Sequence, residues 1–374
     1  MKYDKDERIV MTLDAGGTNF VFSAIRANKE IITPITLPSN AHDLHSCLST
    51  VSDGFTKVKE KIPRKPVAIS FAFPGPAYYP NGIIGEPQNF PSFKGQGGIA
   101  LGPMLKERFK LPVFSNNDGN LYAYGEAIAG FLPFINNLLE EAGSPKRYKN
   151  LLGITLGTGF GGGIVHDGQL FLGDNSTDAE ICLLRNKLEP RFHAEESVSA
   201  RGIKRYYASN AGIDIEDSPG PKEISEIASG KAKGNKEAAV LAYRMMGEVL
   251  GDVLANTITL IDAMVVIGGG ISRAYSLFLP SVIKEMNGKF ETASGGSIPR
   301  MFVKAYNLED SNDMDLFING ELKEISVLGT DKKIRYDPLK RIGVGITKLG
   351  TSNAASLGAY AFALNKLDSS YRKT

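Results

Sequence analysis

Two apolar runs of the sequence each end in a glycine-rich turn that carries a threonine. The run "MTLD" ends at Asp14 and leads into two glycines and a threonine, and the run "LLGITL" leads into Gly-Thr-Gly. Glycines let backbone amides approach phosphate oxygens, and threonine hydroxyls add donors. One interpretation of the pattern is a nucleotide-phosphate site made of two facing turns. The candidate residues are Asp14, Gly16, Gly17, Thr18, Gly157, Thr158 and Gly159.

Two other interpretations apply to such turns. A single glycine turn is often only a tight turn whose backbone needs a positive φ. The segment "GTGFGG" at 157–162 also matches the dinucleotide-binding pattern. That pattern requires a helix directly after the turn, whereas "GGIVHDGQLFLG" is typical of a hairpin. The sequence contains no Walker-type phosphate loop, so a phosphate site of that kind is excluded.

A third polar segment is a candidate for acid–base chemistry. "SNNDGN" follows a short strand at about 111–115 and is expected to be a polar loop containing Asn117 and Asp118. Transfer of a phosphoryl group to a hydroxyl needs a base that takes the hydroxyl proton, and an aspartate is suited to that task. Taken alone, such a segment is more often an ordinary turn. Together with the glycine turns, it predicts the acceptor side of a phosphoryl-transfer site.

The elements around these segments predict an α/β protein with a repeated unit. Strands are expected at 8–14, 19–26 and 30–37, joined by short turns into an antiparallel meander. The segment 150–173 repeats the order of strand, glycine turn and strand. Because strands alternate with helical patterns elsewhere, the repeat predicts two related lobes with a cleft between them.

Apolar spacing predicts the remaining elements. Residues 121–143 have helical spacing, with a break expected at Pro133. A helix at 236–262 leads to a strand at 263–272, which ends in a third glycine turn. Residues 302–347 are expected to be irregular, with hairpin-like runs.

Composition limits the class of protein. The chain has 374 residues, of which 42% are hydrophobic, and 43 basic against 41 acidic residues give a formal net charge of +2. Because basic and acidic residues are nearly equal in number, the charge favours neither a nucleic acid nor an anionic membrane as a partner. Two cysteines form no disulfide framework, and no apolar stretch has the length of a membrane span or the character of a signal sequence. We expect a cytoplasmic protein with a small-molecule substrate.

Four segments together resemble the ROK family of sugar kinases, within the actin-like ATPase superfamily. They are "LDAGGTN", "NNDGN", "GITLGTGFGGGIV" and "VVIGGGIS", in an order that covers most of the chain. The resemblance implies a two-lobed α/β actin-like ATPase (ribonuclease H-like) fold with duplicated β-meander units and a central cleft. We assign 1–120 and a C-terminal helix at about 354–374 to a small lobe, and 121–353 to a large lobe with insertions near 135–149 and 303–340. A homodimer is expected.

The resemblance also implies the chemistry, in which ATP with Mg²⁺ donates its γ-phosphoryl group to a hydroxyl of a hexose or an amino sugar. Asp118 matches the family's base, and Asp14 would hold Mg²⁺ through water. The sugar ligands assigned in this way are Asn117, Glu180, Glu196, Gly75 and Asn89. The ATP ligands are Asp14, Gly16, Gly17, Thr18, Asn19, Gly157, Thr158, Gly159, Gly268, Gly269 and Gly270.

One segment departs from the family pattern. In "DAEICLL", a leucine occupies the position of a sugar-binding histidine, and the three cysteines of the family's zinc motif are missing. We therefore expect no zinc, and we expect apolar packing to order this loop instead. In the following "AEESVSARGI", Glu196 is the first choice for a sugar-binding glutamate, and Glu195, one position away, stays an alternative. The side chains expected to pack are Leu183, Leu184, Leu188 and Phe192.

Two other functions are open at this point. The family includes sugar-responsive transcriptional regulators, but these carry an N-terminal helix-turn-helix domain, and here the first phosphate strand begins near Arg8. A non-catalytic sugar- or nucleotide-binding protein is the second alternative, because the zinc motif is missing. The presence of Asp14, Thr18 and Asp118 favours an ATP-dependent sugar kinase over both.

Overall fold

The computed structural model describes residues 2–371. Contacts between the residues divide the chain into two compact units. Within the described residues, unit 1 combines 2–130, 163–179 and 348–371, and unit 2 combines Phe131–Gly162 with Glu180–Thr347.

Unit 1 contains, in its described part, a six-stranded sheet with the order β3-β2-β1-β5-β8, in which β4 also pairs with β2. β1 and β2 are antiparallel with Asp14 opposite Val21, and β1, β5 and β8 are parallel neighbours. The predicted meander is confirmed, but the expected strand at 30–37 is two short strands, because Pro34 has no amide for the ladder. The strands are β1 (Val10–Ala15), β2 (Asn19–Arg26), β3 (Lys29–Glu30), β4 (Ile35–Pro38), β5 (Ala68–Ala72) and β8 (Val113–Asn116).

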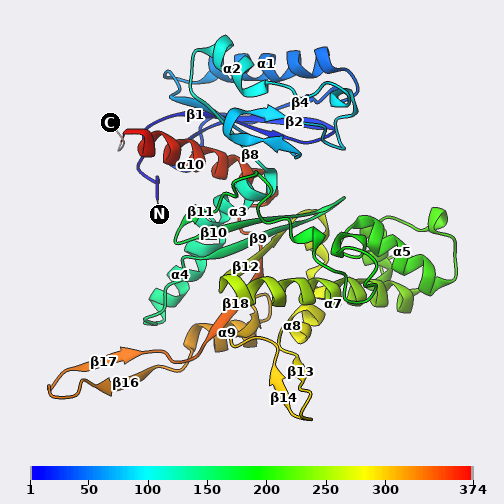
Figure 1. Ribbon diagram of the computed structural model, residues 1–374, viewed down its shortest axis with the longest axis vertical. Coiled ribbons are helices and arrows are strands. Elements are labelled where there is room, and N and C mark those ends of the chain that lie inside the picture. The colour runs from blue at the N-terminus through cyan, green and yellow to red at the C-terminus, as the bar shows by residue number, and fades with distance from the viewer. Residues whose placement is uncertain (1, 372–374) are drawn as a thin grey trace. The chain divides into compact units, whose positions relative to one another are not determined.

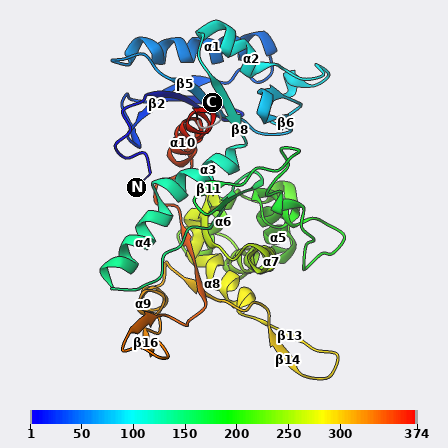
Figure 2. The same ribbon diagram turned by 60° about the vertical axis from the view of Figure 1, so that its left-hand side comes forward.

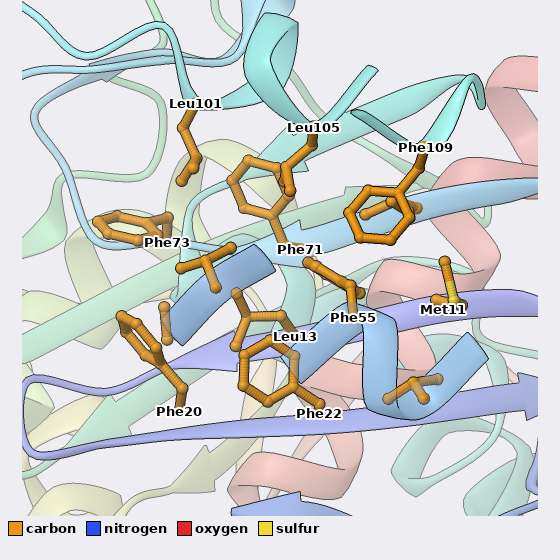
Figure 3. Packing of buried hydrophobic residues seen from close by; sticks show 14 of the residues in the cluster. Met11, Leu13, Phe20, Phe22, Phe55, Phe71, Phe73, Leu101, Leu105 and Phe109 are labelled. Atoms are coloured by element: carbon orange, nitrogen blue, oxygen red, sulfur yellow. The ribbon is translucent and has the colours of Figure 1, made fainter. Parts of the chain in front are cut away.

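An aromatic core covers one face of this sheet (Figure 3). Met11 and Leu13 of β1 and Phe20 and Phe22 of β2 point to this face, because side chains two positions apart in a strand share a face. Phe22 meets Phe55 edge to face, with ring centroids 5.2 Å apart. This core fixes β1 and β2, and with them the glycine turn that joins them.

Helices α1 (Leu44–Lys61) and α2 (Leu101–Phe109) lie over the aromatic core (Figure 1). α1 begins after Asp43, whose carboxylate accepts a hydrogen bond from the Ser46 amide at 2.7 Å and caps the helix. Its buried side chains recur at helical spacing and enter the core.

Helices α3 (Asp118–Ile128) and α10 (Thr351–Tyr371) lie on the other face of the sheet and pack on each other (Figures 1 and 2). A Cβ built on Gly125 would lie 1.9 Å from the carbonyl oxygen of Ala354, so only glycine allows this backbone contact. The contact holds α3, and the first residue of α3 is Asp118.

Unit 2 is built on parallel strands in the order β9-β12-β18-β15. β9 continues through a turn at 157–159 into β10, which, with β11, extends the same sheet. All five residues of β12 are buried, as is typical of a parallel strand covered on both faces. The strands of this sheet are β9 (Leu151–Leu156), β10 (Phe160–His166), β11 (Gln169–Leu170), β12 (Met264–Gly268), β15 (Lys304–Asn307) and β18 (Arg341–Ile346), of which β11 and the part of β10 from Gly163 onward are assigned to unit 1.

Three helices of unit 2, namely α5 (Ala200–Ala211), α6 (Pro221–Ala228) and α8 (Tyr275–Met286), pack against α7, which runs from Lys236 to Ile261. α7 approaches α8 closely at Gly247, where a Cβ would lie 2.6 Å from the carbonyl oxygen of Phe278. Across residues 2–371, no helix is both long enough and apolar enough to cross a membrane. The other helices of the unit are α4 (Phe131–Glu141) and α9 (Ser311–Asn319).

Two-stranded hairpins and short 3₁₀ helices complete the described chain. The hairpin β6–β7 (Ala77–Tyr78 and Ile83–Ile84) belongs to unit 1. The hairpins β13–β14 (Lys289–Glu291 and Ser297–Pro299) and β16–β17 (Lys323–Ser326 and Lys333–Tyr336) belong to unit 2. The 3₁₀ helices are η1 (Tyr79–Asn81), η2 (Pro91–Phe93), η3 (Ile181–Leu183), η4 (Ala194–Glu196), η5 (Ile215–Asp217) and η6 (Gly270–Ala274).

Two of the predictions about secondary structure need correction. The helical stretch at 121–143 breaks before Phe131 and not at Pro133, which lies in the first turn of α4, where a missing amide costs no hydrogen bond. The stretch 302–347 is more regular than predicted, since it contains β15, α9 and β18, whereas the hairpin-like run predicted near 324–329 does lie in a hairpin, at 323–336. α9 is capped by Asp310, whose carboxylate accepts from two backbone amides of the first turn.

Candidate active site

The turn after β1 presents two unused backbone amides. Its ends are joined by a hydrogen bond from the Gly16 amide to the carbonyl oxygen of Asn19 at 3.0 Å. Ser39 hydrogen-bonds to two carbonyl oxygens of the turn: its amide donates to that of Thr18 at 3.0 Å, and its hydroxyl donates to that of Gly17 at 2.5 Å. The amides of Gly17 and Thr18 have no acceptor among residues 2–371. They are therefore available to a phosphate oxygen.

Asn89 lies against the same turn. A Cβ built on Gly17 would lie 2.8 Å from the Cβ of Asn89, so the contact requires glycine at this position. The residues Thr18, Asn19 and Asn89 are all exposed. The structure thus brings one residue predicted for sugar binding next to the residues predicted for phosphate binding.

Asp14 lies at the end of β1, close enough to Asp118 for their charges to interact. Burial raises the pKa of Asp14 to about 6, a hydrogen bond with Ser352 lowers it, and the charge of Asp118 raises it. Two neighbouring carboxylates repel each other when both are ionised. A divalent cation would relieve that repulsion, and Mg²⁺ prefers carboxylate and water oxygens. The residues at this place therefore fit a magnesium ion.

The raised pKa of Asp14 predicts a pH-dependent effect of the substitution Asp14→Asn. An acid whose pKa is raised by folding stabilises the folded state below its unfolded pKa near 3.8, and this contribution is lost as the pH rises through about 6. In EDTA, the unfolding temperature of Asp14→Asn should therefore rise relative to the wild type between pH 5 and pH 8. Asp174→Asn, an exposed acid of unit 1, is the control. A difference that does not change with pH would contradict the prediction.

Asp118 is the first residue of α3, not part of a loop as predicted. Asn117 caps the helix, because its side-chain oxygen accepts a hydrogen bond from the Gly119 amide at 2.8 Å. Asp118 is solvent-accessible on one side, while the protein around it withdraws the carboxylate from bulk water and raises its pKa; a hydrogen bond from Gly119 lowers that pKa. An accessible carboxylate with a raised pKa suits a base that accepts a hydroxyl proton.

Tyr79 joins two residues that were predicted for the sugar site. Its hydroxyl donates to the carbonyl oxygen of Phe73 at 2.8 Å and lies 3.4 Å from the Nδ2 atom of Asn117. A Cβ built on Gly75 would lie 3.5 Å from the same hydroxyl. Sequence reasoning missed Tyr79 because it is one of 14 tyrosines and belongs to no motif.

The turn after β9 has the same construction as the first turn. Its ends are joined by a hydrogen bond from the Gly157 amide to the carbonyl oxygen of Gly159 at 3.0 Å, and the Gly157 carbonyl accepts from Ala200 at 2.9 Å. The amides of Thr158 and Gly159 have no acceptor in the described chain. A Cβ built on Gly157 would meet nothing within 4 Å, so packing does not require glycine there. Close approach of a ligand would explain this glycine.

In the third glycine turn, at 268–270, backbone conformation and packing explain why one of the three residues is glycine. Gly269 has a φ of 87°, and a Cβ on it would lie 2.2 Å from the carbonyl oxygen of Leu156. Gly268 is the last residue of β12. A Cβ on Gly270 would meet nothing within 4 Å. Strand packing therefore explains Gly269, whereas Gly270 leaves room for a ligand.

Three glutamates of unit 2 are linked to one another through a series of side-chain contacts. The carboxylate of Glu195 accepts from the Phe160 amide at 2.9 Å, directly beside the second glycine turn. Arg201 donates to both Glu195 and Glu196, at 2.8 Å in each case. His193 lies 3.5 Å from Glu196 through Nε2. Its Nδ1 lies 3.3 Å from the carbonyl oxygen of Cys182, whose thiol donates to Glu180 at 3.4 Å.

Three of the four side chains expected to order this loop by apolar packing are exposed, and Leu188 is half-buried; the buried apolar side chains of the segment are Ile181, Ala194 and Val198. The side chain of Leu183 is 67% exposed, and Leu184 and Phe192 are exposed as well. Asn186 is completely buried in their place. Its Nδ2 donates to the hydroxyl of Ser197 at 2.7 Å, and its Oδ1 accepts from the backbone amides of residues 188 and 189.

An ion pair joins the same loop to α5. Arg205 of α5 donates to both carboxylate oxygens of Glu189 and to the carbonyl oxygen of Glu196 at 3.2 Å. Tyr206 contacts the hydroxyl of Ser197. A buried amide and a two-pronged Arg–carboxylate pair thus connect residues 186–197 where the sequence led us to expect hydrophobic contacts.

The predicted site residues are divided between the two units. Unit 1 holds the first glycine turn, Asp14, Gly75, Asn89, and the Asn117–Asp118 pair. Unit 2 holds the second and third glycine turns, Glu180 and Glu196. Among the described residues, no group of three or more His, Cys, Asp or Glu side chains has a metal-binding arrangement.

Comparison with known proteins agrees with this architecture. Two sheets, each with an antiparallel meander that turns at glycines beside parallel strands, define the actin-like ATPase fold. The model of the ROK family matches residues 10–311. The chain therefore belongs to the ROK family.

Individual relatives cover most of the chain. The crystal structure of a glucokinase from Parabacteroides distasonis is 53% identical with a TM-score of 0.86, and the match covers 98% of this chain and 99% of that one. The N-acetyl-D-glucosamine kinase of Vibrio cholerae serotype O1 is 28% identical over 284 residues, which are 73% of this chain and 87% of that protein. A ROK family glucokinase from Streptomyces griseus, solved with glucose and AMPPNP, has the same fold at 18% identity, with a TM-score of 0.60 and 94% and 98% coverage.

Proposed function

We propose that this protein is an ATP-dependent sugar kinase that phosphorylates a hydroxyl of a hexose or an amino sugar. The observation that carries the proposal is the pair of glycine turns with unused amides, one of them beside Asp14 and Asp118. The similarity to a glucokinase over nearly the whole chain supports the same activity.

The phosphates of ATP are the proposed ligands of the glycine turns. Gly17 and Thr18 offer amides from unit 1, and Thr158 and Gly159 offer amides from unit 2. Glycines at 157 and 270, whose Cβ atoms would meet open space, support close approach of a nucleotide. Mg²⁺ bound with ATP supplies charge neutralisation at the phosphates, and Asp14 is its proposed partner through water.

Asp118 is the proposed base of the reaction. The sugar hydroxyl attacks the γ-phosphorus, its proton passes to the Asp118 carboxylate, and the bond between the γ-phosphorus and the bridging oxygen breaks, releasing ADP. Asn117, Gly75, Asn89 and Glu180 are the proposed contacts of the sugar hydroxyls. The hydrogen bond from Asn117 to Gly119 supports the orientation of the first turn of α3, and with it of Asp118.

A matched pair of substitutions distinguishes which of Glu195 and Glu196 binds the sugar. The contact between Glu195 and Phe160 lies beside the phosphate turn, where the reacting hydroxyl must lie, and this geometry favours Glu195 as sugar ligand. We expect Glu195→Gln to raise the KM for sugar ~10-fold with kcat within threefold, because it removes uniform binding. Glu196→Gln should raise it less. A larger KM increase for Glu196→Gln in steady-state kinetics would favour the assignment made from the sequence.

We further propose that the loop 180–199 needs no zinc. The hydrogen bonds of Asn186 and the Arg205–Glu189 pair support this, because they connect the segment that a metal would otherwise hold. Elemental analysis of tag-free protein should find well under one zinc per chain. A stoichiometric zinc content that survives mild chelation would contradict the prediction.

The activity is tested by supplying ATP, Mg²⁺ and a panel of single sugars and by measuring ADP release. We expect strong ADP release with glucose or N-acetyl-D-glucosamine and little without sugar. Identification of the sugar phosphate by mass spectrometry confirms transfer rather than ATP hydrolysis. If no hexose or amino sugar is phosphorylated, the proposal is wrong, and titration calorimetry with the same sugars would then identify a non-catalytic binding protein.

We place this activity in the cytoplasm, where ATP is available, and we propose a homodimer with a small-molecule substrate and without nucleic-acid or membrane partners. The even charge of the chain supports the last point, because Lys and Arg exceed Asp and Glu by only two.

A further inference from the structure

Two hairpins extend from the rest of unit 2, away from its parallel strands (Figures 1 and 2). Every residue of β13, β14, β16 and β17 is exposed. We call the hairpin β16–β17, residues 323–336, the arm. A two-stranded hairpin alone is at best marginally stable in water, so an extended hairpin is stabilised by whatever covers it.

The arm has one apolar face and one charged face. Ile325 lies opposite Ile334 across the hairpin, and the neighbouring pair, Glu324 and Arg335, points to the other face, because side chains alternate along a strand. At the tip, Leu328 is 96% exposed. The face of Ile325 and Ile334 is therefore exposed and mainly apolar, and Lys323 lies on it opposite Tyr336.

The second hairpin and the base of the arm repeat this pattern. In β13–β14, Phe290 lies opposite Ile298, and both are about half exposed. A groove of about 560 Å³ lies between the base of β13–β14 and the base of the arm. Phe302 lines this groove and is 89% exposed.

The exposed apolar area matches what one subunit contributes to a stable dimer. The exposed fractions of the seven side chains add up to about four whole side chains. At roughly 150–250 Å² for a large side chain, they expose roughly 600–1,000 Å². A standard interface buries about 800 Å² on each partner. The side chains are Phe290, Ile298, Phe302, Ile325, Leu328, Ile334 and Tyr336.

Charge identifies the kind of partner. The segment 321–337 carries four acidic and four basic residues and has no net charge. Neither a nucleic acid nor an anionic membrane is attracted to such a segment. A second copy of the chain presents the same apolar face and the same balanced charges, and a two-fold axis places identical surfaces against each other.

We propose that the two hairpins, β13–β14 and the arm, together with the groove at Phe302, form the interface with a second copy of this chain. The arm lies in the region 303–340, which the family resemblance led us to expect as an insertion. The proposal does not depend on the kinase activity, because its test measures association.

The test compares two glutamates introduced at adjacent positions on opposite faces of the arm. The full-length wild type, Ile325→Glu and Ser326→Glu are measured by sedimentation velocity from 0.1 to 50 μM. We expect a wild-type dimer, and a dimer dissociation constant at least ~100-fold higher for Ile325→Glu, because that carboxylate is buried without a partner. Ser326→Glu, on the charged face, should change the dimer dissociation constant less than threefold. Phe302→Asp should behave like Ile325→Glu.

Amide hydrogen exchange distinguishes loss of the dimer from unfolding of the arm within the monomer. Amides at 323–336 should be protected in the wild type and lose protection as the protein is diluted, while the rest of unit 2 stays protected in every variant. A monomeric wild type at 50 μM overturns the proposal. So does a dimer that Ile325→Glu leaves intact, or equal dissociation by Ile325→Glu and Ser326→Glu.

Discussion

Replacing Asp118 with Asn should lower kcat by at least ~100-fold while leaving the dissociation constant for sugar within about threefold. A positioned base typically contributes ~10²–10⁴-fold to such a step, and a 100-fold loss corresponds to ~2.7 kcal/mol in the activation barrier. Asn keeps the shape of the side chain and still hydrogen-bonds the hydroxyl, but it cannot take the proton. The measurements are steady-state kinetics and calorimetric titration with sugar.

Asn117→Ala is the contrasting variant. Asn117 caps α3 and lies beside Tyr79, so its loss should weaken sugar binding as well as rate. Circular dichroism would check that both variants keep the fold, because the carboxylate of Asp118 is solvent-accessible and Asp118→Asn changes no core contact. An Asp118→Asn enzyme with nearly normal kcat would remove Asp118 as the base.

Replacing Gly125 with Ala should destabilise unit 1 by at least ~2 kcal/mol, through overpacking against a backbone that cannot move aside. The added methyl group would lie 1.9 Å from the carbonyl oxygen of Ala354, and a methyl on Gly358 would lie 1.8 Å from that of Leu121. Either substitution must push α3 and α10 apart. We expect the unfolding temperature to fall by ~4–8 °C, measured by differential scanning calorimetry.

Gly220→Ala is the matched control for this prediction. Gly220 is exposed, has a φ of −72°, and has nothing within 4 Å of a built Cβ. It precedes a helix as its N-cap, so Ala should cost under ~1 kcal/mol there. Because α3 begins at Asp118, Gly125→Ala should also lower kcat below the unfolding transition. If the stability of Gly125→Ala matches that of Gly220→Ala, the close helix contact is not a constraint on the fold.

The glycine turns and the elements that flank them could be predicted from the sequence because their cause is local. Alternating apolar residues make β1 and β2 strands with one buried face, and the glycines between them can only be a turn. The same holds for the turn at 157–159. The order of the motifs then predicted the family, which the match over residues 10–311 confirms.

Errors occurred where the local pattern was ambiguous. Asn117 and Asp118 have the composition of a turn, and only the cap contacts with Gly119 make them the start of a helix. The leucines after Glu180 predicted apolar packing, but only tertiary contacts decide which side chains are buried. Here Asn186, which is hydrogen-bonded within residues 186–197, takes the interior position instead.

The sequence by itself determined the two glycine turns, the acid beside the first of them and the absence of the zinc cysteines, because each depends on residue types within a few positions. Only the tertiary structure decided that the Glu195 carboxylate meets the Phe160 amide, that Tyr79 lies beside Asn117, and that the arm is exposed along one apolar face. These features depend on which distant segments the chain brings together and which it leaves uncovered. Burial and hydrogen bonding between distant segments are set by packing of the whole unit, which no local spacing of residues specifies.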